Sequence, residues 1–195
     1  MKNRILALCA VVAAIAAPIA IAGCGSSGTT TSVDPNAAEV SPPGDIPDNQ
    51  AFVPYSPPGA GYSVTVPEGW PRSTQGNSVT FSDKLNSIQL DSGSASAAPT
   101  VADGKAELQK LSSSVSGFSP GQVTTVQRKS GPALLVTYKG DGPPDPVTGK
   151  TITDAFERYE FFQAGKLGIV TVSGPDGADN VDPWMIVTDS FKWTQ

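Results

Sequence analysis

The stretch TITDAFERYEFFQAGKLGIVTV, residues 151–172, decides the fold class of this 195-residue chain. It holds two runs rich in β-branched and aromatic residues, which favour extended backbone. Ala164 and Gly165 stand between the runs as a two-residue turn. We therefore predict two long antiparallel strands, Thr151–Gln163 and Lys166–Val172.

The segments before this hairpin are also extended. ALLVTY, residues 133–138, is apolar on both faces of a strand, which is typical of a strand covered on two sides. The turn 129–132 joins it to a further predicted strand, Val123–Arg128. Alternating apolar residues predict three shorter strands upstream. They lie around Tyr62–Val66, Val79–Phe81 and Ile88–Leu90.

Two segments have helical periodicity instead. The first predicted helix follows the capping pair Thr100 and Asp103 and ends near Gly117. The second begins near Asp179 or Asn180. Its predicted inner stripe is Val181, Trp184, Thr188 and Phe191. Because strands outnumber helices and the helices lie far apart in the chain, we predict an α+β fold, an antiparallel β-sheet flanked by helices.

The N-terminus has the parts of a secretory signal peptide. Lys2 and Arg4 supply positive charge, an apolar run covers Ile5–Ala22, and small residues precede Cys24. A transmembrane helix is the alternative for this run. Pro18 and the small residues at its end favour a cleaved signal.

The end of this run, Ile21-Ala22-Gly23-Cys24, resembles the lipobox of bacterial lipoproteins. In those proteins the cysteine receives a diacylglyceryl group and becomes the first residue of the mature chain. The resemblance implies a signal peptide over residues 1–23, lipid attachment at Cys24, and an anchor on the extracytoplasmic face of the cell membrane. A secreted protein with a spare thiol is the alternative.

Composition predicts how the remaining chain is divided. Residues 24–58 are rich in Gly, Ser, Thr and Pro and poor in large apolar residues, so we expect a flexible tether behind the lipidated cysteine. Residues 59–195 are enough for one globular domain.

Charge and the absence of histidine exclude several functions. The chain carries 13 Lys and Arg against 18 Asp and Glu, a net charge of −5, so nucleic acid is not an expected partner. It has no histidine, which excludes Ser-His-Asp and Cys-His nucleophilic sites and HExxH zinc sites. We expect a protein that is not an enzyme and has neither cofactor nor metal.

Several segments together resemble a known family. The lipobox, GYSVTVPEGW at 61–70, ALLVTY, ERYEFF at 157–162 and DPWMIVTDSFKW at 182–193 resemble the LpqN-type lipoproteins of actinobacterial envelopes. The resemblance covers most of residues 60–195. It implies a PsbP-like α/β/α sandwich and an envelope lipoprotein without catalysis. It also implies an envelope lipid or an envelope protein as partner.

Two polar clusters have ordinary structural interpretations. The acidic run around Asp176, Asp179, Asn180 and Asp182 has too irregular a spacing for a calcium loop, and a turn followed by a capped helix start is favoured. Arg158 and Glu160 point to the same face of their strand, which favours a salt bridge over a catalytic carboxylate pair.

Aromatic side chains are the candidate ligand-binding residues. FERYEFF places aromatics on both faces of one strand, so one face is covered by a helix and the other is free to line a cleft. The candidates are Trp70, Phe156, Tyr159, Phe161, Phe162 and Trp184. The first hypothesis is a lipid-anchored protein that binds an envelope lipid or glycolipid between sheet and helix. The alternative is a protein-interaction module that docks on a membrane or envelope complex, and a hydrolase comes third.

Overall fold

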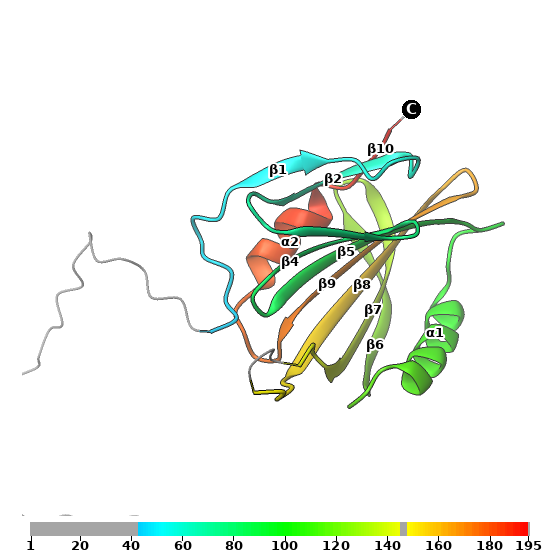
Figure 1. Cartoon of the computed structure of the whole chain (residues 1–195). Helices are drawn as coiled ribbons and strands as arrows, with labels where there is room; N and C mark the ends of the chain where they lie inside the picture. Colours follow the sequence, from blue (N-terminus) through cyan, green and yellow to red (C-terminus); the bar gives the residue numbers. More distant parts are fainter. Residues whose placement is uncertain (1–42, 145–147, 195) are drawn as a thin grey trace, which may run out of the picture. The chain divides into compact units, whose positions relative to one another are not determined.

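A computed structural model describes residues 43–144 and 148–194 of the chain (Figure 1). The predicted signal peptide, Cys24 and residues 24–42 of the predicted tether lie outside the described residues. One compact unit, Glu39–Gln195, contains every residue of the hydrophobic core. This unit therefore carries within itself the packing that it needs to fold.

The described chain contains ten strands and two helices. The strands are β1 (Phe52–Tyr55), β2 (Tyr62–Pro67), β3 (Arg72–Gln75), β4 (Ser78–Asp83), β5 (Asn86–Ser94), β6 (Ser119–Arg128), β7 (Gly131–Asp141), β8 (Thr153–Gln163), β9 (Lys166–Pro175) and β10 (Lys192–Trp193). The helices are α1 (Val101–Ser114) and α2 (Val181–Asp189). The predicted α+β class is confirmed.

Seven strands form one large antiparallel sheet in the order β3-β4-β5-β9-β8-β7-β6. The hairpin β8–β9 lies at its centre, with Gln163 opposite Lys166. Both residues of the connecting turn have positive φ, 49° at Ala164 and 83° at Gly165, as a tight turn between twisted strands requires. The stretch that predicted the fold is thus the middle of the sheet.

A second, three-stranded sheet has the order β1-β2-β10 and is also antiparallel. Figure 1 shows α2 beside β2 and α1 beside β6 and β7. Tyr159 and Phe161 of β8 join one core with Tyr62 of β2 and Val187 of α2. The small sheet and α2 therefore cover one face of the large sheet.

The other face of the large sheet is covered by α1 over β6 and β7. Thr100 and Asp103 form the predicted capping box at the start of α1. Gly104 is the buried residue of this helix, and a Cβ there would lie only 2.5 Å from a methyl group of Val123. A glycine therefore allows α1 to approach the sheet closely. The helix ends at Ser114, before the expected end near Gly117.

The inner stripe predicted for α2 is partly wrong. Trp184, Thr188 and Phe191 are buried, but the side chain of Val181 is 68% exposed. Val187 takes the inner position. The buried side of α2 is formed by Pro183, Trp184, Val187 and Thr188, and its first residue faces solvent.

The predicted tether is too long, because residues 43–58 belong to the folded domain. Ile46 is 4% exposed and lies in the core, and β1 pairs with β2. The helix α2 starts directly after Asn180, as predicted, but the side chain of Asn180 does not cap it and holds the residues before β1 instead. Its Oδ1 accepts a hydrogen bond from the Ile46 N–H at 2.8 Å, and its Nδ2 donates to the Gly44 carbonyl at 2.9 Å. Because the segment around Ile46 is rich in proline and glycine, its composition gives no sign that this one apolar residue is buried.

One buried carboxylate makes stability depend on pH. Asp154 at the start of β8 is 2% exposed, and among the described residues its Oδ1 has no hydrogen-bond partner. Burial raises the pKa of Asp154 to about 6. The folded state therefore favours the protonated form.

We expect Asp154→Asn to stabilise the protein near neutral pH. Protonated Asp154 makes its full contribution to the free energy of unfolding below about pH 4. This contribution falls as the pH rises and is lost above about pH 6. The variant should therefore gain about 1–2 kcal/mol at pH 7 and lose that advantage toward pH 4. Urea unfolding at a series of pH values measures this. Parallel pH profiles for variant and parent would contradict it.

Candidate functional site

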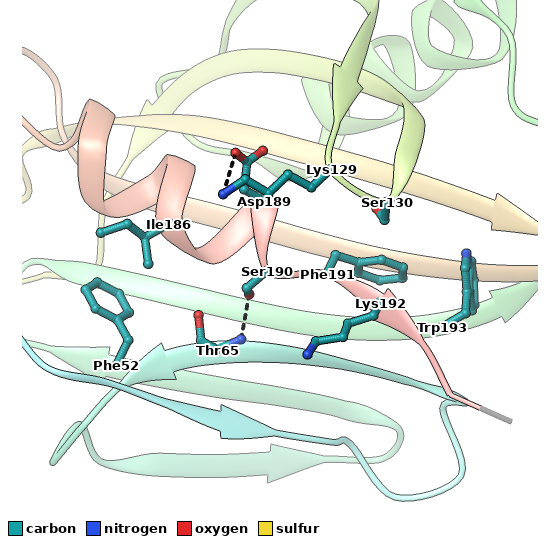
Figure 2. A pocket seen from close by; sticks show the side chains of 10 residues that line it. All are labelled: Phe52, Thr65, Lys129, Ser130, Ile186, Asp189, Ser190, Phe191, Lys192 and Trp193. Carbon is teal, nitrogen blue, oxygen red and sulfur yellow. Dashed lines mark hydrogen bonds and ion pairs between the residues drawn. The ribbon is translucent and has the colours of Figure 1, made fainter.

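One pocket of the described residues is a groove with a volume of about 720 Å³ (Figure 2). It lies between the end of α2, the small sheet and the turn that joins β6 to β7. Its lining residues are Phe52, Thr65, Lys129, Ser130, Ile186, Asp189, Ser190, Phe191, Lys192 and Trp193.

Aromatic packing holds the apolar wall of this groove. Phe191 stacks on Phe161, with ring centroids 3.9 Å apart, and on Tyr62 at 4.8 Å. Trp193 meets Phe191 edge-to-face at 5.1 Å. The ring of Phe191 can lie so close to the sheet because Gly168 of β9 is beneath it, where a Cβ would come within 2.7 Å of the ring. The wall is therefore rigid.

The end of α2 is tied to the small sheet by Ser190. Its hydroxyl accepts a hydrogen bond from the Thr65 N–H at 2.6 Å and donates to the Val187 carbonyl at 2.6 Å. Figure 2 shows this bond spanning the groove between helix and strand. Ser190 thereby sets the spacing of the two walls.

Two other hydroxyls of the groove lack partners. Thr65 Oγ1 and Ser130 Oγ are buried atoms for which the described residues supply no hydrogen bond. A buried hydroxyl without a partner typically costs 1–3 kcal/mol. Both oxygens are closed off from solvent, so each is an unsatisfied group inside the wall and does not face the open groove.

Charged groups gather at the same end of α2. Asp189 lies 3.6 Å from Lys129 Nζ and 3.9 Å from Arg128 Nε. Behind the groove, Arg128 Nη2 donates to the Tyr159 hydroxyl at 2.7 Å, and that hydroxyl donates to Glu157 at 2.5 Å. Burial and the neighbouring Glu157 raise the pKa of Tyr159, so its phenol remains a donor.

The structure separates the aromatic residues proposed from sequence. Tyr159 and Phe161 are buried in the core, and Phe162 is half-buried on the face of β8 opposite to them. Phe156 and Trp184 line a smaller pocket of about 280 Å³ near β6 and β7. Trp70 lines a different pocket beside Ile46.

Most of the residues that line this groove were not identified from the sequence. Phe52 lies in a segment assigned to the tether, and Lys192 and Trp193 lie in a short final strand. These segments meet only because β2 pairs with both β1 and β10. The signal that was available is the pair Phe191 and Trp193, which alternate around a lysine.

The acidic run before α2 serves structure. Asp176 forms a salt bridge of 2.6 Å with Lys139, and Asp182 lies in the first turn of α2. Arg158 and Glu160 form the predicted salt bridge at 3.0 Å. Within residues 43–144 and 148–194, no group of three acidic, His or Cys residues is placed to hold a metal ion. No helix in that same part of the chain is long and apolar enough to cross a membrane.

Comparison with known proteins supports the fold alone. No family model matches the chain, and no curated protein matches it either. Among solved structures, the chain is similar to the cyanobacterial PsbP protein CyanoP from Synechocystis sp. PCC 6803, at 17% identity over 74% of this chain and 93% of that one, with a TM-score of 0.50.

Two further structures have lower scores. The Ran-binding protein Mog1p of Saccharomyces cerevisiae matches at 10% identity over 75% of this chain and 97% of that one, with a TM-score of 0.49. A protein from Bacteroides thetaiotaomicron matches at 14% identity over 73% of this chain, with a TM-score of 0.48. The chain spans 48% of the length of that protein. The fold of this chain is PsbP-like.

Proposed function

We propose that this chain is a lipid-anchored lipoprotein of the cell envelope, of the LpqN type, and that its groove binds an envelope lipid or glycolipid without catalysis. The proposed anchor is Cys24, on the extracytoplasmic face of the membrane. The observation that carries the binding proposal is the groove itself. Its volume of about 720 Å³ lies within the range of small-molecule sites.

The lining of the groove matches an amphiphilic ligand. Phe52, Ile186, Phe191 and Trp193 supply apolar surface to an acyl chain. The ammonium groups of Lys129 and Lys192 supply polar partners to a headgroup. A ligand that is apolar at one end and polar at the other uses both.

A second function, docking on a membrane or envelope complex, is favoured by the outer face of α2. Val181, Met185 and Ile186 are 68%, 43% and 48% exposed. Apolar side chains gathered on one helix face are typical of interaction surfaces. Ile186 belongs to both this face and the groove, whereas Val181 belongs to the face alone.

The two functions separate in one matched pair of variants. Ile186→Glu places a carboxylate at the groove, and Val181→Glu places the same group on the same helix outside it. The probe is N-phenyl-1-naphthylamine, an uncharged apolar fluorophore that becomes bright in an apolar site. We expect Ile186→Glu to weaken its binding at least tenfold, which is about 1.4 kcal/mol, and Val181→Glu to leave it unchanged.

An equal loss of affinity in both variants would mean that the probe binds to the outer face of α2, and would contradict binding in the groove. Both side chains are well exposed, so neither change should unfold the domain. Circular dichroism of the two variants checks this.

A further inference from the structure

The charged residues that line the groove are mostly cationic. Lys129 and Lys192 each carry an ammonium group. The one carboxylate of the lining is Asp189. A site that offers donors and positive charge is complementary to an anion.

The single carboxylate of Asp189 does not balance all the positive charge around the groove. It is already close to both Lys129 Nζ and Arg128 Nε, at 3.6 and 3.9 Å. Among the described residues, no salt bridge joins Lys192 to a carboxylate. The lining thus has a surplus of positive charge in a chain whose net charge is −5.

The two lysines are free to move toward a ligand. The Lys129 side chain is 79% exposed, so its salt bridge with Asp189 contributes little and is readily exchanged. Arg128 is 19% exposed and stays with Asp189 and Tyr159 when Lys129 leaves. Figure 2 shows Lys129 beside Asp189 and Lys192 next to Phe191, both at the groove. An anionic headgroup in the groove is attracted by both charges.

We propose that the groove selects amphiphiles with an anionic headgroup, a carboxylate or a phosphate, which the ammonium groups of Lys129 and Lys192 attract. This inference rests on the proposed function and adds the chemistry of the ligand's head. The apolar wall at Phe191 and Trp193 holds the alkyl chain.

The test compares headgroups on one alkyl chain. Dodecanoate, dodecyl phosphate, dodecyl maltoside and dodecyltrimethylammonium, each below its micellar concentration, displace N-phenyl-1-naphthylamine from the chain 25–195, which contains the whole compact unit. We expect the two anionic probes to bind at least tenfold more tightly than the other two. The relative affinities of dodecanoate and dodecyl phosphate show whether the groove prefers a carboxylate or a phosphate headgroup.

Variants assign this preference to residues. The double variant Lys129→Met and Lys192→Met should lose at least tenfold in affinity for the anionic probes and nothing for dodecyl maltoside. Lys105→Met, on the exposed side of α1, is the matched control and should change neither affinity. Thr65→Val should change neither affinity, because its hydroxyl is closed off from the groove. It should raise the unfolding midpoint of the protein, since it removes a buried hydroxyl without a partner.

The outcomes separate the two proposals. If all four probes displace the fluorophore equally, the anionic head is wrong and lipid binding stands. If the anionic preference persists in the double lysine variant, these residues do not bind the head. If neither the fluorophore nor any probe binds, the proposed function fails and this inference fails with it.

Discussion

Replacing Phe191 with alanine should destabilise the domain by about 3–5 kcal/mol, the usual cost of removing a buried aromatic side chain. Phe191 is 2% exposed and contacts the rings of Phe161, Tyr62 and Trp193. These residues come from β8, β2 and β10, so one ring joins the large sheet to the small one. Its loss leaves a cavity that Gly168, with no side chain, does not fill.

Urea unfolding measured by circular dichroism tests this prediction. Phe162→Ala is the matched control, because Phe162 is a half-buried phenylalanine of β8 outside the core cluster. Its loss should be smaller by at least 1.5 kcal/mol, in keeping with its smaller buried area. Similar losses in the two variants would mean that Phe191 does not join the sheets as described.

Replacing Asn180 with alanine should cost about 2–4 kcal/mol and release the segment before β1. The change leaves the Ile46 N–H, the Asn86 Oδ1 and one bond of the Gly44 carbonyl without their partner. Each buried group left unsatisfied typically costs 1–3 kcal/mol. The Asn86 Nδ2 still donates to Gly44 at 2.9 Å, so part of the attachment survives.

Hydrogen exchange measures the release directly. The amide of Ile46 should exchange faster by at least tenfold in Asn180→Ala, while amides of the β8–β9 hairpin change only with global stability. Asp179→Ala, one residue away on an exposed side chain, is the control. An unchanged Ile46 amide would show that the segment is held by something other than Asn180.

The large sheet was predictable because its signals are local. Gly165 specifies a turn by its own backbone preference, and alternation along β2 and β8 assigns inner faces without knowledge of any partner strand. The capping box of α1 is likewise written in four consecutive residues. Local chemistry of this kind is visible before the chain is folded.

What the sequence did not reveal depends on distant partners. Ile46 is a single apolar residue in a polar segment, and its burial depends on Asn180, more than a hundred residues away. A short final strand around Phe191–Thr194 is predictable and matches β10, but the four-residue strand β1 is too short to show periodicity, and nothing local indicates that both strands pair with β2. The groove is built from these same short elements, so its lining was not predictable.

The candidate aromatics illustrate the same limit. Alternation correctly placed Tyr159 and Phe161 on one face of β8, but alternation does not say whether that face lines a cavity or a filled core. Phe191 stacks on Phe161, and Tyr62 stacks on Phe191, so this face is covered by a filled core. Trp193, at the edge of that cluster, is what remains to line the groove.

The most direct test of lipid binding is native mass spectrometry of the chain 25–195 after incubation with lipids extracted from its own host. This chain contains the compact unit Glu39–Gln195 and with it the complete groove. We predict one amphiphile bound per protein, carried through purification and absent from Ile186→Glu but retained by Val181→Glu. A protein that stays empty under conditions in which a known lipid carrier is loaded, or one whose lipid survives Ile186→Glu, would contradict the groove as a lipid site.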